Sequence, residues 1–269
     1  MSNTRTPVVC FIHDLGDQRV WWRLTEALPP GVRTLVVEQT PTGRLTPAAL
    51  AKQIMTAARA VLPDPGVDLV VASDVAATAG AELVADDSAA HALLINPDPG
   101  ALIGHPDYQV PEPGAETREL LQAMAPYQEQ LLTHGTLPTE GISAMVNHSL
   151  GRLDALDEQD RSLLSDIATA RLTQSMPWDL SAAFGAAPQR EEDWFAHLSA
   201  SPERFTVYSG KNAGLGTAIR TVLSRNVPQT HVMRGSTHTA FPWLETPTTL
   251  AALITDLVGP ESQNFRQDL

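Results

Sequence analysis

The sequence predicts an α/β domain built on a mostly parallel sheet with helices on both faces. Short runs rich in valine, isoleucine and leucine alternate with amphipathic segments of helical length over residues 7–96 and again from residue 205. These apolar runs lack the polar–apolar alternation of a strand with one solvated face, which indicates strands that are buried on both faces. Polar residues follow several of the runs directly, at the carboxyl ends where parallel sheets bind their ligands.

The first part of the chain alternates strands and helices. We expect strands over the apolar runs at residues 7–12, 32–37, 67–71 and 90–96. We expect the intervening helices over residues 21–28, 46–62 and 75–85. Thr46 suits the N-cap of the second helix and Pro47 its first position. This order implies right-handed crossovers and parallel strand pairs.

The pattern changes after Pro97. Five prolines interrupt residues 97–113. Helical stretches then follow, with no strand between them, at residues 115–134, 138–150, 155–175 and 191–199. We predict a helical lid, residues 99–202, inserted into an α/β core formed by residues 1–98 and 203–269. A plain helical subdomain that packs on the core fits the same residues.

The core resumes after the insertion. We expect strands at residues 205–209 and 228–233, and helices at residues 217–225 and 248–258. The tail after Gly259 is polar, and we expect its end to fray.

The acidic composition narrows the classes of function. A net charge of −13 argues against nucleic-acid binding and disfavours anionic membranes, because both need basic side chains at the phosphates. Cys10 is the only cysteine, so no internal disulfide can form. The first residues lack the apolar core of a signal peptide, and no apolar run is long enough to span a bilayer. We therefore expect a cytoplasmic protein, and the excess of arginine over lysine suggests a GC-rich bacterial genome.

No motif for a cofactor or a metal stands out. The chain has neither a glycine-rich phosphate loop nor a cysteine–histidine cluster, so we expect no cofactor and no metal. The expected partner is a hydrophobic small molecule, bound by a monomer or a homodimer.

The stretch from Val67 to Val84 carries the strongest functional signal. It reads as a buried strand, a tight turn of small residues and a helix, with Ala72-Ser-Asp-Val-Ala76 at the turn. Small neighbours allow a close turn whose apex side chain points outward, and the helix amino terminus favours a negative charge there. Asp74 fits the apex better than Ser73, because Ser73 would place β-branched residues at the flanking positions. An N-cap role for Asp74 also fits this stretch alone.

Two further segments follow predicted strands. His13-Asp-Leu-Gly16 comes after the first strand and precedes Trp22. Gly235-Ser-Thr-His238 comes after the last strand and precedes Phe241 and Glu245-Thr-Pro247.

Together with the Asp74 turn, these segments resemble the α/β-hydrolase superfamily. They match its nucleophile elbow, its His-Gly-x-Gly segment and its Gly-x-x-His…Glu-x-Pro ending around the catalytic histidine. The resemblance covers nearly the whole chain apart from residues 99–202, and it implies the α/β-hydrolase fold with an inserted helical lid. The sequence departs from the superfamily pattern at two positions, because Asp74 replaces the usual serine and Asp14 replaces a glycine.

The resemblance implies that His238 is the catalytic base, since imidazole takes and returns protons near neutral pH. A carboxylate usually orients that histidine. The turn in which most members carry it holds no acid here, although Asn212 could orient His238 without neutralising it. Some members carry the acid one strand earlier, where Asp98 stands between two prolines. A turn-forming role for Asp98 fits equally well.

The remaining site residues also come from the resemblance. The superfamily builds its oxyanion hole from backbone amides, which places Asp14, Leu15 and Val75 beside the substrate. The carboxylate of Asp14 would repel an oxyanion if it pointed inward. In the lid, Tyr127 could contact substrate or, together with Tyr108, open an epoxide ring.

Members with aspartate at the apex include epoxide hydrolases and haloalkane dehalogenases. Their carboxylate attacks carbon and forms an ester, which water activated by histidine then hydrolyses. Both usually have Trp or Arg directly after the aspartate, where this chain has Val75. Trp178 or Trp194 in the lid could replace the halide-binding Trp of dehalogenases. The apolar lid residues suit a hydrophobic substrate, or form the lid's own core: Met124, Met145, Met176, Trp178 and Phe184.

Four functions remain open. The first is a hydrolase in which Asp74 attacks an epoxide-like or related electrophile and His238 activates water. The second is a lyase or cyclase of bacterial natural-product biosynthesis, with Asp74 and His238 as acid and base and no covalent intermediate. The third is a binding module without chemistry, and the fourth is a serine esterase that uses Ser73. The retained His238 favours catalysis.

Overall fold

The structure is a computed structural model, and it describes residues 5–39, 47–64, 66–102, 104–109, 118, 122, 125–127, 138–143, 155–174, 194–210, 213–237 and 240–259. Its centre is a parallel sheet of six strands in the order β2-β1-β3-β4-β5-β6. The strands are β1 (Val8–Ile12), β2 (Arg33–Val36), β3 (Leu69–Ser73), β4 (Ala92–Ile95), β5 (Phe205–Ser209) and β6 (His231–Arg234). The prediction of a mostly parallel α/β sheet is confirmed.

The order of the strands places the site. The chain enters the sheet at β1, adds β2 on one side, and then crosses to the other side to form β3 and all later strands. The direction of winding therefore reverses between β1 and β3. In parallel sheets, ligands bind in the crevice at the carboxyl ends of the strands next to such a reversal. His13 follows β1 and Asp74 follows β3, so both residues flank this crevice.

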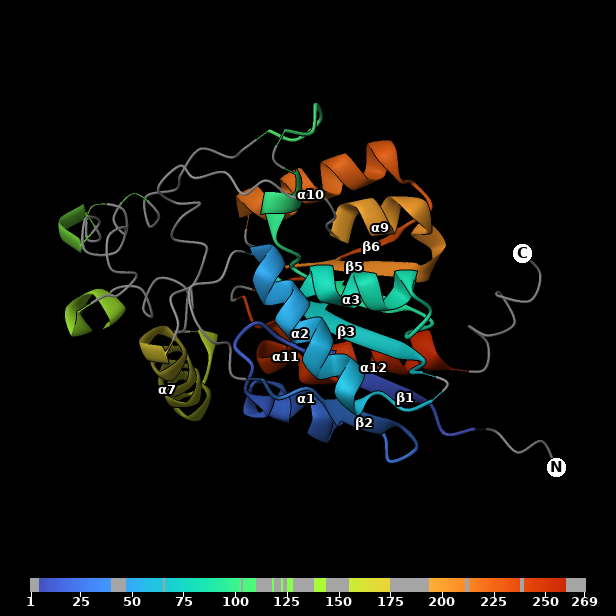
Figure 1. Cartoon of the computed structure of the whole chain (residues 1–269), viewed down its shortest axis with the longest axis horizontal. Helices are drawn as coiled ribbons and strands as arrows, with labels where there is room; N and C mark the ends of the chain where they lie inside the picture. The colour runs from blue at the N-terminus through green and yellow to red at the C-terminus, as the bar shows by residue number, and fades with distance from the viewer. Residues whose placement is uncertain are drawn as a thin grey trace.

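Helices cover both faces of the sheet (Figure 1). One face packs on the helices α2 (Pro47–Val61), α3 (Ala76–Ala85), α9 (Trp194–Ala200) and α10 (Ala213–Asn226). The other face packs on α1 (Trp22–Ala27), α7 (Glu158–Gln174), α11 (Pro242–Glu245) and α12 (Pro247–Val258). Four short 3-10 turns also lie in the described chain: η1 (Gln18–Trp21), η2 (Pro99–Leu102), η3 (Ala125–Tyr127) and η5 (Pro202–Arg204). Among the described residues, none of the helices is long and apolar enough to cross a membrane.

Side chains of each strand alternate between these two layers. In β1, Cys10 and Ile12 join the layer of α3, whereas Val9 and Phe11 join the layer of α12. All of them are fully buried or nearly so, which explains why the strands read as continuous apolar runs. We call these two layers the α3 layer and the α12 layer.

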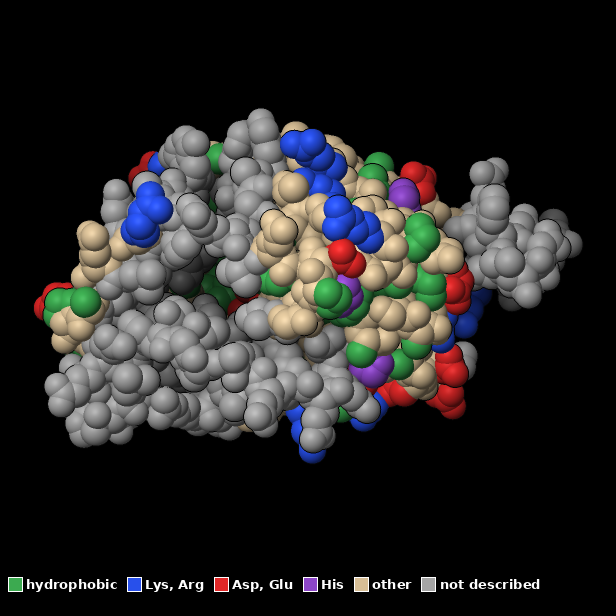
Figure 2. All heavy atoms as spheres, turned by 90° about the horizontal axis from the view of Figure 1, so that it is seen from above, with side chains coloured by type: hydrophobic (Ala, Val, Ile, Leu, Met, Phe, Trp, Pro, Cys, Tyr) green, Lys and Arg blue, Asp and Glu red, His purple; other side chains and the backbone are tan. Residues whose placement is uncertain are grey.

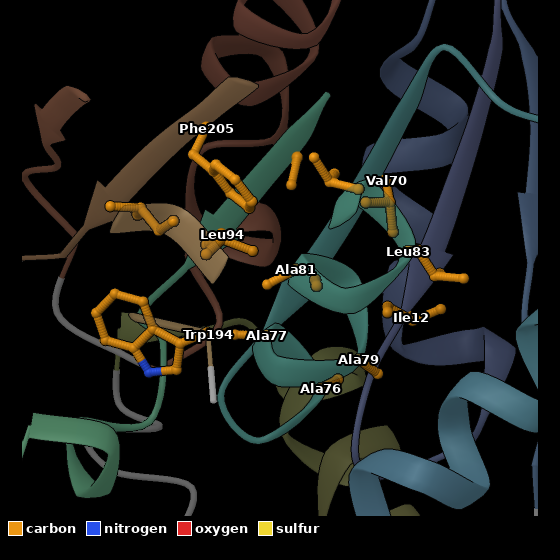
Figure 3. Packing of buried hydrophobic residues seen from close by; sticks show 14 of the residues in the cluster. Ile12, Val70, Ala76, Ala77, Ala79, Ala81, Leu83, Leu94, Trp194 and Phe205 are labelled. Atoms are coloured by element: carbon orange, nitrogen blue, oxygen red, sulfur yellow. The ribbon is translucent and has the colours of Figure 1, made fainter. Parts of the chain in front are cut away.

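Helix α3 packs unusually close to the sheet because its inner face is built of alanine and glycine. Figure 3 shows Ala77 and Ala81 on the side of α3 that faces Leu94 and Trp194. A Cβ placed on Gly80 would lie 2.7 Å from the Ala72 Cβ, so any larger residue would push helix and strand apart. The short, tight connection between β3 and α3 depends on this contact.

The middle of the chain is described in part. Helices α7 and α9 match two of the expected helical stretches, while most of residues 115–134 and 138–150 lies outside the described residues. Trp194 of α9 is fully buried in the α3 layer and donates its indole N–H to the Asp98 carbonyl at 2.8 Å. The suggestion that Trp194 could replace the halide-binding Trp is therefore wrong, because its ring packs in the core and its indole N–H is already bonded to Asp98.

Helix α7 is attached to the core by apolar and polar contacts. Leu164 and Ile167 join the α12 layer. Asp160 is 1% exposed, accepts the Trp22 indole N–H at 2.9 Å and lies 2.5 Å from the Arg23 Nε. A buried carboxylate of this kind needs its partners, so α7 is fixed beside η1 and α1 at the carboxyl end of β1.

Candidate active site

Asp74 stands at the apex of the turn between β3 and α3. Its φ of 49° is in the left-handed region, which few residues other than glycine adopt. Its N–H donates to the Ile95 carbonyl at 3.3 Å, and its carbonyl accepts from Ala77 and Asp98 at 3.1 and 3.2 Å. The Asp74 side chain is exposed. The N-cap of α3 is Val75, so Asp74 is held in a strained turn in front of the helix.

Ser73 is placed quite differently. It is the last residue of β3, is 2% exposed, and pairs with Ile95 of β4. Its hydroxyl has no hydrogen-bond partner among the described residues. Because side chains alternate along a strand, Ser73 faces the α12 layer together with Val71. The residue that projects from the turn is therefore Asp74.

The amino terminus of α3 lies next to Asp74. Within the described part of the chain, the Val75 N–H has no hydrogen-bond partner. An unsatisfied amide at the start of a helix carries a partial positive charge, which stabilises anions nearby. Val75 can therefore stabilise negative charge that develops at the Asp74 carboxyl group.

His13, one strand away, lies in an aromatic cage. It is 6% exposed, and its ring stacks on Phe241 with the two planes 13° apart and the centroids at 5.8 Å. Trp21 and Trp243 meet the ring edge-on at 5.8 and 5.4 Å. The histidine is thus a structural part of the α12 layer at the edge of the crevice.

Two groups compete for the Nδ1 atom of His13. The Leu15 N–H lies 2.9 Å from it with good hydrogen-bond geometry, and an Asp14 carboxylate oxygen lies 2.7 Å from it without such geometry. We assign the hydrogen bond to Leu15, which makes Nδ1 the acceptor. Two consequences follow for the expected oxyanion site. The Leu15 amide is already engaged, and the Asp14 carboxylate turns back toward His13.

Asp98 forms the turn after β4. It is 5% exposed, and its Oδ1 accepts the Gly100 N–H at 2.9 Å at the start of η2. Burial, and secondly the charge of Asp98, raise the pKa of Tyr108, so this carboxylate lies near the phenol. His238 and Asn212 lie outside the described residues, so the pairing of Asp98 with His238 stays a prediction.

Asn96 lies in the same turn as Asp98, but the sequence reasoning gave it no role of its own. It has a φ of 45°, and its side-chain oxygen accepts the Gly210 N–H at 2.7 Å. Its side-chain N–H reaches the Ala240 carbonyl at 3.4 Å. A Cβ on Gly210 would lie 2.9 Å from the Thr237 Oγ1. Asn96 thus contacts Ala240, and Gly210 lies against Thr237. These are the residues directly after and before positions 238 and 239.

The other expected site residues are less informative. Tyr127 is half-buried in η3 and packs against the α12 layer. Tyr108 is 9% exposed and belongs to the α3 layer. Trp178 lies outside the described residues. Among the residues that the structure describes, no three histidine, cysteine, aspartate or glutamate side chains come together as a metal site would require.

Comparisons with known proteins identify the fold. No family model matches the sequence, and no curated protein does so either. Among solved structures, the chain is similar to a loop variant of the haloalkane dehalogenase DbeA from Bradyrhizobium elkanii, with a TM-score of 0.62 and 14% identity over 99% of this chain and 93% of that one. It is also similar to the N-acyl homoserine lactone degrading enzyme Est816, with a TM-score of 0.59 and 13% identity over 94% and 93% of the two chains.

A third similar structure is the enol-lactonase from Burkholderia xenovorans LB400. The TM-score is 0.56 and the identity 14%, over 96% of this chain and 93% of that one. Each likeness extends over nearly the whole of both chains, and the parallel sheet and its helices follow the same plan. The chain therefore has the α/β-hydrolase fold.

Proposed function

We propose that the protein is a hydrolase that acts on a hydrophobic small molecule through Asp74 and His238. Asp74 is the nucleophile toward an epoxide-like electrophile, and His238 activates the water that completes the reaction. The observation that carries this proposal is the backbone of Asp74, whose φ of 49° holds an exposed carboxylate at the strand–helix turn. Strain of this kind costs about 1–3 kcal/mol and is concentrated at functional sites.

The proposed reaction has two steps. One oxygen of the Asp74 carboxylate forms a bond to an epoxide carbon, and the carbon–oxygen bond of the ring breaks. The ring oxygen takes a proton from an acid, for which Tyr127 is the candidate. His238 then removes a proton from water, and the hydroxide attacks the ester carbonyl of Asp74. The ester carbon–oxygen bond breaks, and the alkoxide of the diol takes the proton of the Asp74 carboxyl group, which becomes a carboxylate again. The imidazolium of His238 returns its proton to the phenolate of Tyr127. Val75, at the amino terminus of α3, stabilises the oxyanion of this second step.

The engaged Leu15 amide favours an electrophilic carbon over an acyl group. Acyl transfer needs oxyanion donors from its first step, and donors of this kind contribute several kcal/mol to the rate. In this fold one such donor was expected at Leu15, but its N–H is bonded to the His13 Nδ1 at 2.9 Å. Attack on an sp³ carbon builds no oxyanion in the first step. An oxyanion forms only in the later hydrolysis of the Asp74 ester, for which the Val75 N–H is the candidate donor.

The similar structures are compatible with this choice. One of them is described as a haloalkane dehalogenase, and two others as a lactone-degrading enzyme and an enol-lactonase. They place hydrolysis of small molecules among the activities that this fold hosts. At 13–14% identity they support the fold alone, and the choice of reaction rests on Asp74 and Leu15.

The decisive experiment is to trap the ester. A His238→Gln variant is incubated with a panel of epoxides, haloalkanes and simple esters, and the intact protein and its peptides are weighed by mass spectrometry. We expect one adduct, located on Asp74, with an epoxide or haloalkane. A single turnover of the wild type in H₂¹⁸O should leave ¹⁸O in the Asp74 carboxylate. Turnover that Ser73→Ala abolishes and Asp74→Asn leaves intact would identify a serine esterase instead.

A lyase or cyclase is the second candidate, and the same observation on Leu15 favours it. Moving protons between Asp74 and His238 builds no tetrahedral oxyanion, so this function does not depend on the Leu15 amide, which is bonded to His13. This function predicts that Asp74→Asn abolishes turnover while no ester accumulates on the His238→Gln variant. A binding module predicts a pocket that binds ligand and an Asp74→Asn variant whose turnover does not differ from that of the wild type.

A further inference from the structure

Two arginines lie together at the carboxyl ends of β5 and β6. Arg220, in the second turn of α10, donates from its guanidinium to the Ser209 hydroxyl at 3.0 Å and to the Thr217 hydroxyl at 2.9 Å. Ser209 is 1% exposed and ends β5. Both acceptors are neutral, so the positive charge of Arg220 is hydrogen-bonded without being balanced.

Arg234 adds a second charge at the same place. It pairs with Ser209 in the parallel register of β5 and β6, and paired residues project to the same face of a sheet. Val207 and Val232, one alternation earlier, both belong to the α3 layer, which α10 covers. The Arg234 side chain therefore starts beside the hydroxyl that holds Arg220. Burial first, and the charge of Arg234 second, lower the pKa of Arg220.

Six other arginines of the described chain are neutralised, whereas Arg33 and Arg161 have no carboxylate partner among the described residues. A carboxylate lies within 4.0 Å of Arg5, Arg19, Arg23, Arg59, Arg204 and Arg225. In the part of the chain that the structure describes, neither Arg220 nor Arg234 has such a partner. Figure 2 shows basic side chains gathered on the face that α10 covers. Although the net charge of the chain is −13, no acid among the described residues pairs with either of these two like charges.

We infer that Arg220 and Arg234 form a binding site for the phosphate group of a small molecule. A guanidinium presents a planar fork of N–H donors that matches a phosphate, and two forks complement a doubly charged group better than a singly charged one. The Ser209 and Thr217 hydroxyls hold one fork in place before the ligand arrives, which reduces the entropy lost on binding. The site stands independently of the function proposed for Asp74.

The site adjoins the catalytic side of the sheet. The Gly235 N–H donates to the Ser209 carbonyl at 2.8 Å, and Gly235 begins the segment that leads to His238. An anion held by Arg220 and Arg234 therefore lies at the carboxyl ends of β5 and β6, on the side covered by α10. The segment from Gly235 to His238 starts from the same strand ends.

Titration of the intact protein with inorganic phosphate tests the site. Calorimetry is run at about pH 8, where phosphate is doubly charged, with sodium chloride keeping the ionic strength constant. The wild type should bind phosphate saturably, and Arg220→Ala and Arg234→Ala should each weaken binding about tenfold or more. Arg225→Ala is the matched control, because Arg225 lies in the same helix but pairs with Asp107 at 3.1 Å. It should bind like the wild type.

Three results would overturn the inference. The first is a heat of phosphate binding to the wild type that titration with sodium chloride reproduces at equal ionic strength. The second is wild-type affinity in both Arg220→Ala and Arg234→Ala. The third is acetate binding as tight as phosphate binding, which would make the site a carboxylate site. Arg234 is exposed, so its variant should fold as the wild type does even if Arg220→Ala does not.

Discussion

The turns after β1 and β3 lie side by side but present their polar residues in opposite ways. Ile12 pairs with Ala72, so His13 and Ser73 begin from neighbouring positions, and both are buried toward the α12 layer. One residue later, Asp74 turns outward with a positive φ. Asp14 instead turns back to within 2.7 Å of the His13 Nδ1. A shift of one residue along the strand therefore separates a polar side chain that is buried in the core from one that is exposed and can meet a ligand.

Removing the Asp74 charge should have the largest effect. Asp74→Asn keeps the size of the side chain but loses the nucleophile, so turnover should fall by at least about 10³-fold. The stability should stay within about 0.5 kcal/mol of the wild type, because the side chain is exposed. Steady-state rates on the best substrate of the epoxide and haloalkane panel and a urea melt measure both quantities. If Asp74→Asn keeps the wild-type turnover rate, the turn after β3 has only a structural role, like the turn after β1.

Removing the His13 ring should have the opposite result to Asp74→Asn, with its main effect on the stability of the fold. His13→Ala deletes a ring that contacts Phe241, Trp21 and Trp243, and we expect about 3 kcal/mol of lost stability. Urea denaturation measures the loss. His231→Ala is the matched control, since His231 is exposed on β6 and should change stability by less than about 0.5 kcal/mol. Equal losses in the two variants would contradict a structural cage around His13.

Asn96→Ala should give an intermediate effect on both properties. It leaves the Gly210 N–H without its acceptor at 2.7 Å, at a cost of about 1–3 kcal/mol. If Asn96 positions the segment that carries His238, the apparent pKa of kcat should move while KM changes little. Asn226→Ala, on the exposed end of α10, is the control. An unchanged pH profile would restrict Asn96 to a structural role.

Ser73→Ala should have the smallest effect. Its buried hydroxyl has no hydrogen-bond partner among the described residues, so replacing it should stabilise the protein slightly, by at most about 1 kcal/mol. Turnover should equal that of the wild type. A Ser73→Ala variant without activity would show that Ser73, and not Asp74, is the reactive residue of the turn after β3.

The sequence predicted the strands and the apex of the β3–α3 turn because both depend on local patterns. Apolar runs marked all six strands, although β3 ends at Ser73 and not at Val71, since alanine and serine give weak strand signals. The small residues Ala72 and Ala76 were sufficient to select Asp74 over Ser73 as the apex residue, and the backbone of Asp74 agrees with that choice. These features are decided within a few residues.

Features that depend on distant residues were missed. Trp194 lies near the carboxyl end of the predicted lid, but it is buried against the turn after β4. Asn96 was passed over in favour of Asp98, because a carboxylate is the usual partner of a catalytic histidine. Its contacts with Gly210 and Ala240 arise only when three strand ends meet. The hydrogen bond from Leu15 to His13 depends on a turn geometry that the residue types do not specify.

The pairing of β4 with β5 has a consequence for how the protein folds and diversifies. These strands are neighbours in the sheet, yet residues 96–204 separate them in the chain. The entropy cost of closing so long a connection grows only logarithmically with its length, so residues can be added or lost there at little cost to the sheet. The same separation delays β5 and β6 relative to the locally connected strands, because distant contacts form more slowly. We expect β1 to β4 to assemble first, and the length of the connection between β4 and β5 to be a property that evolution changes easily.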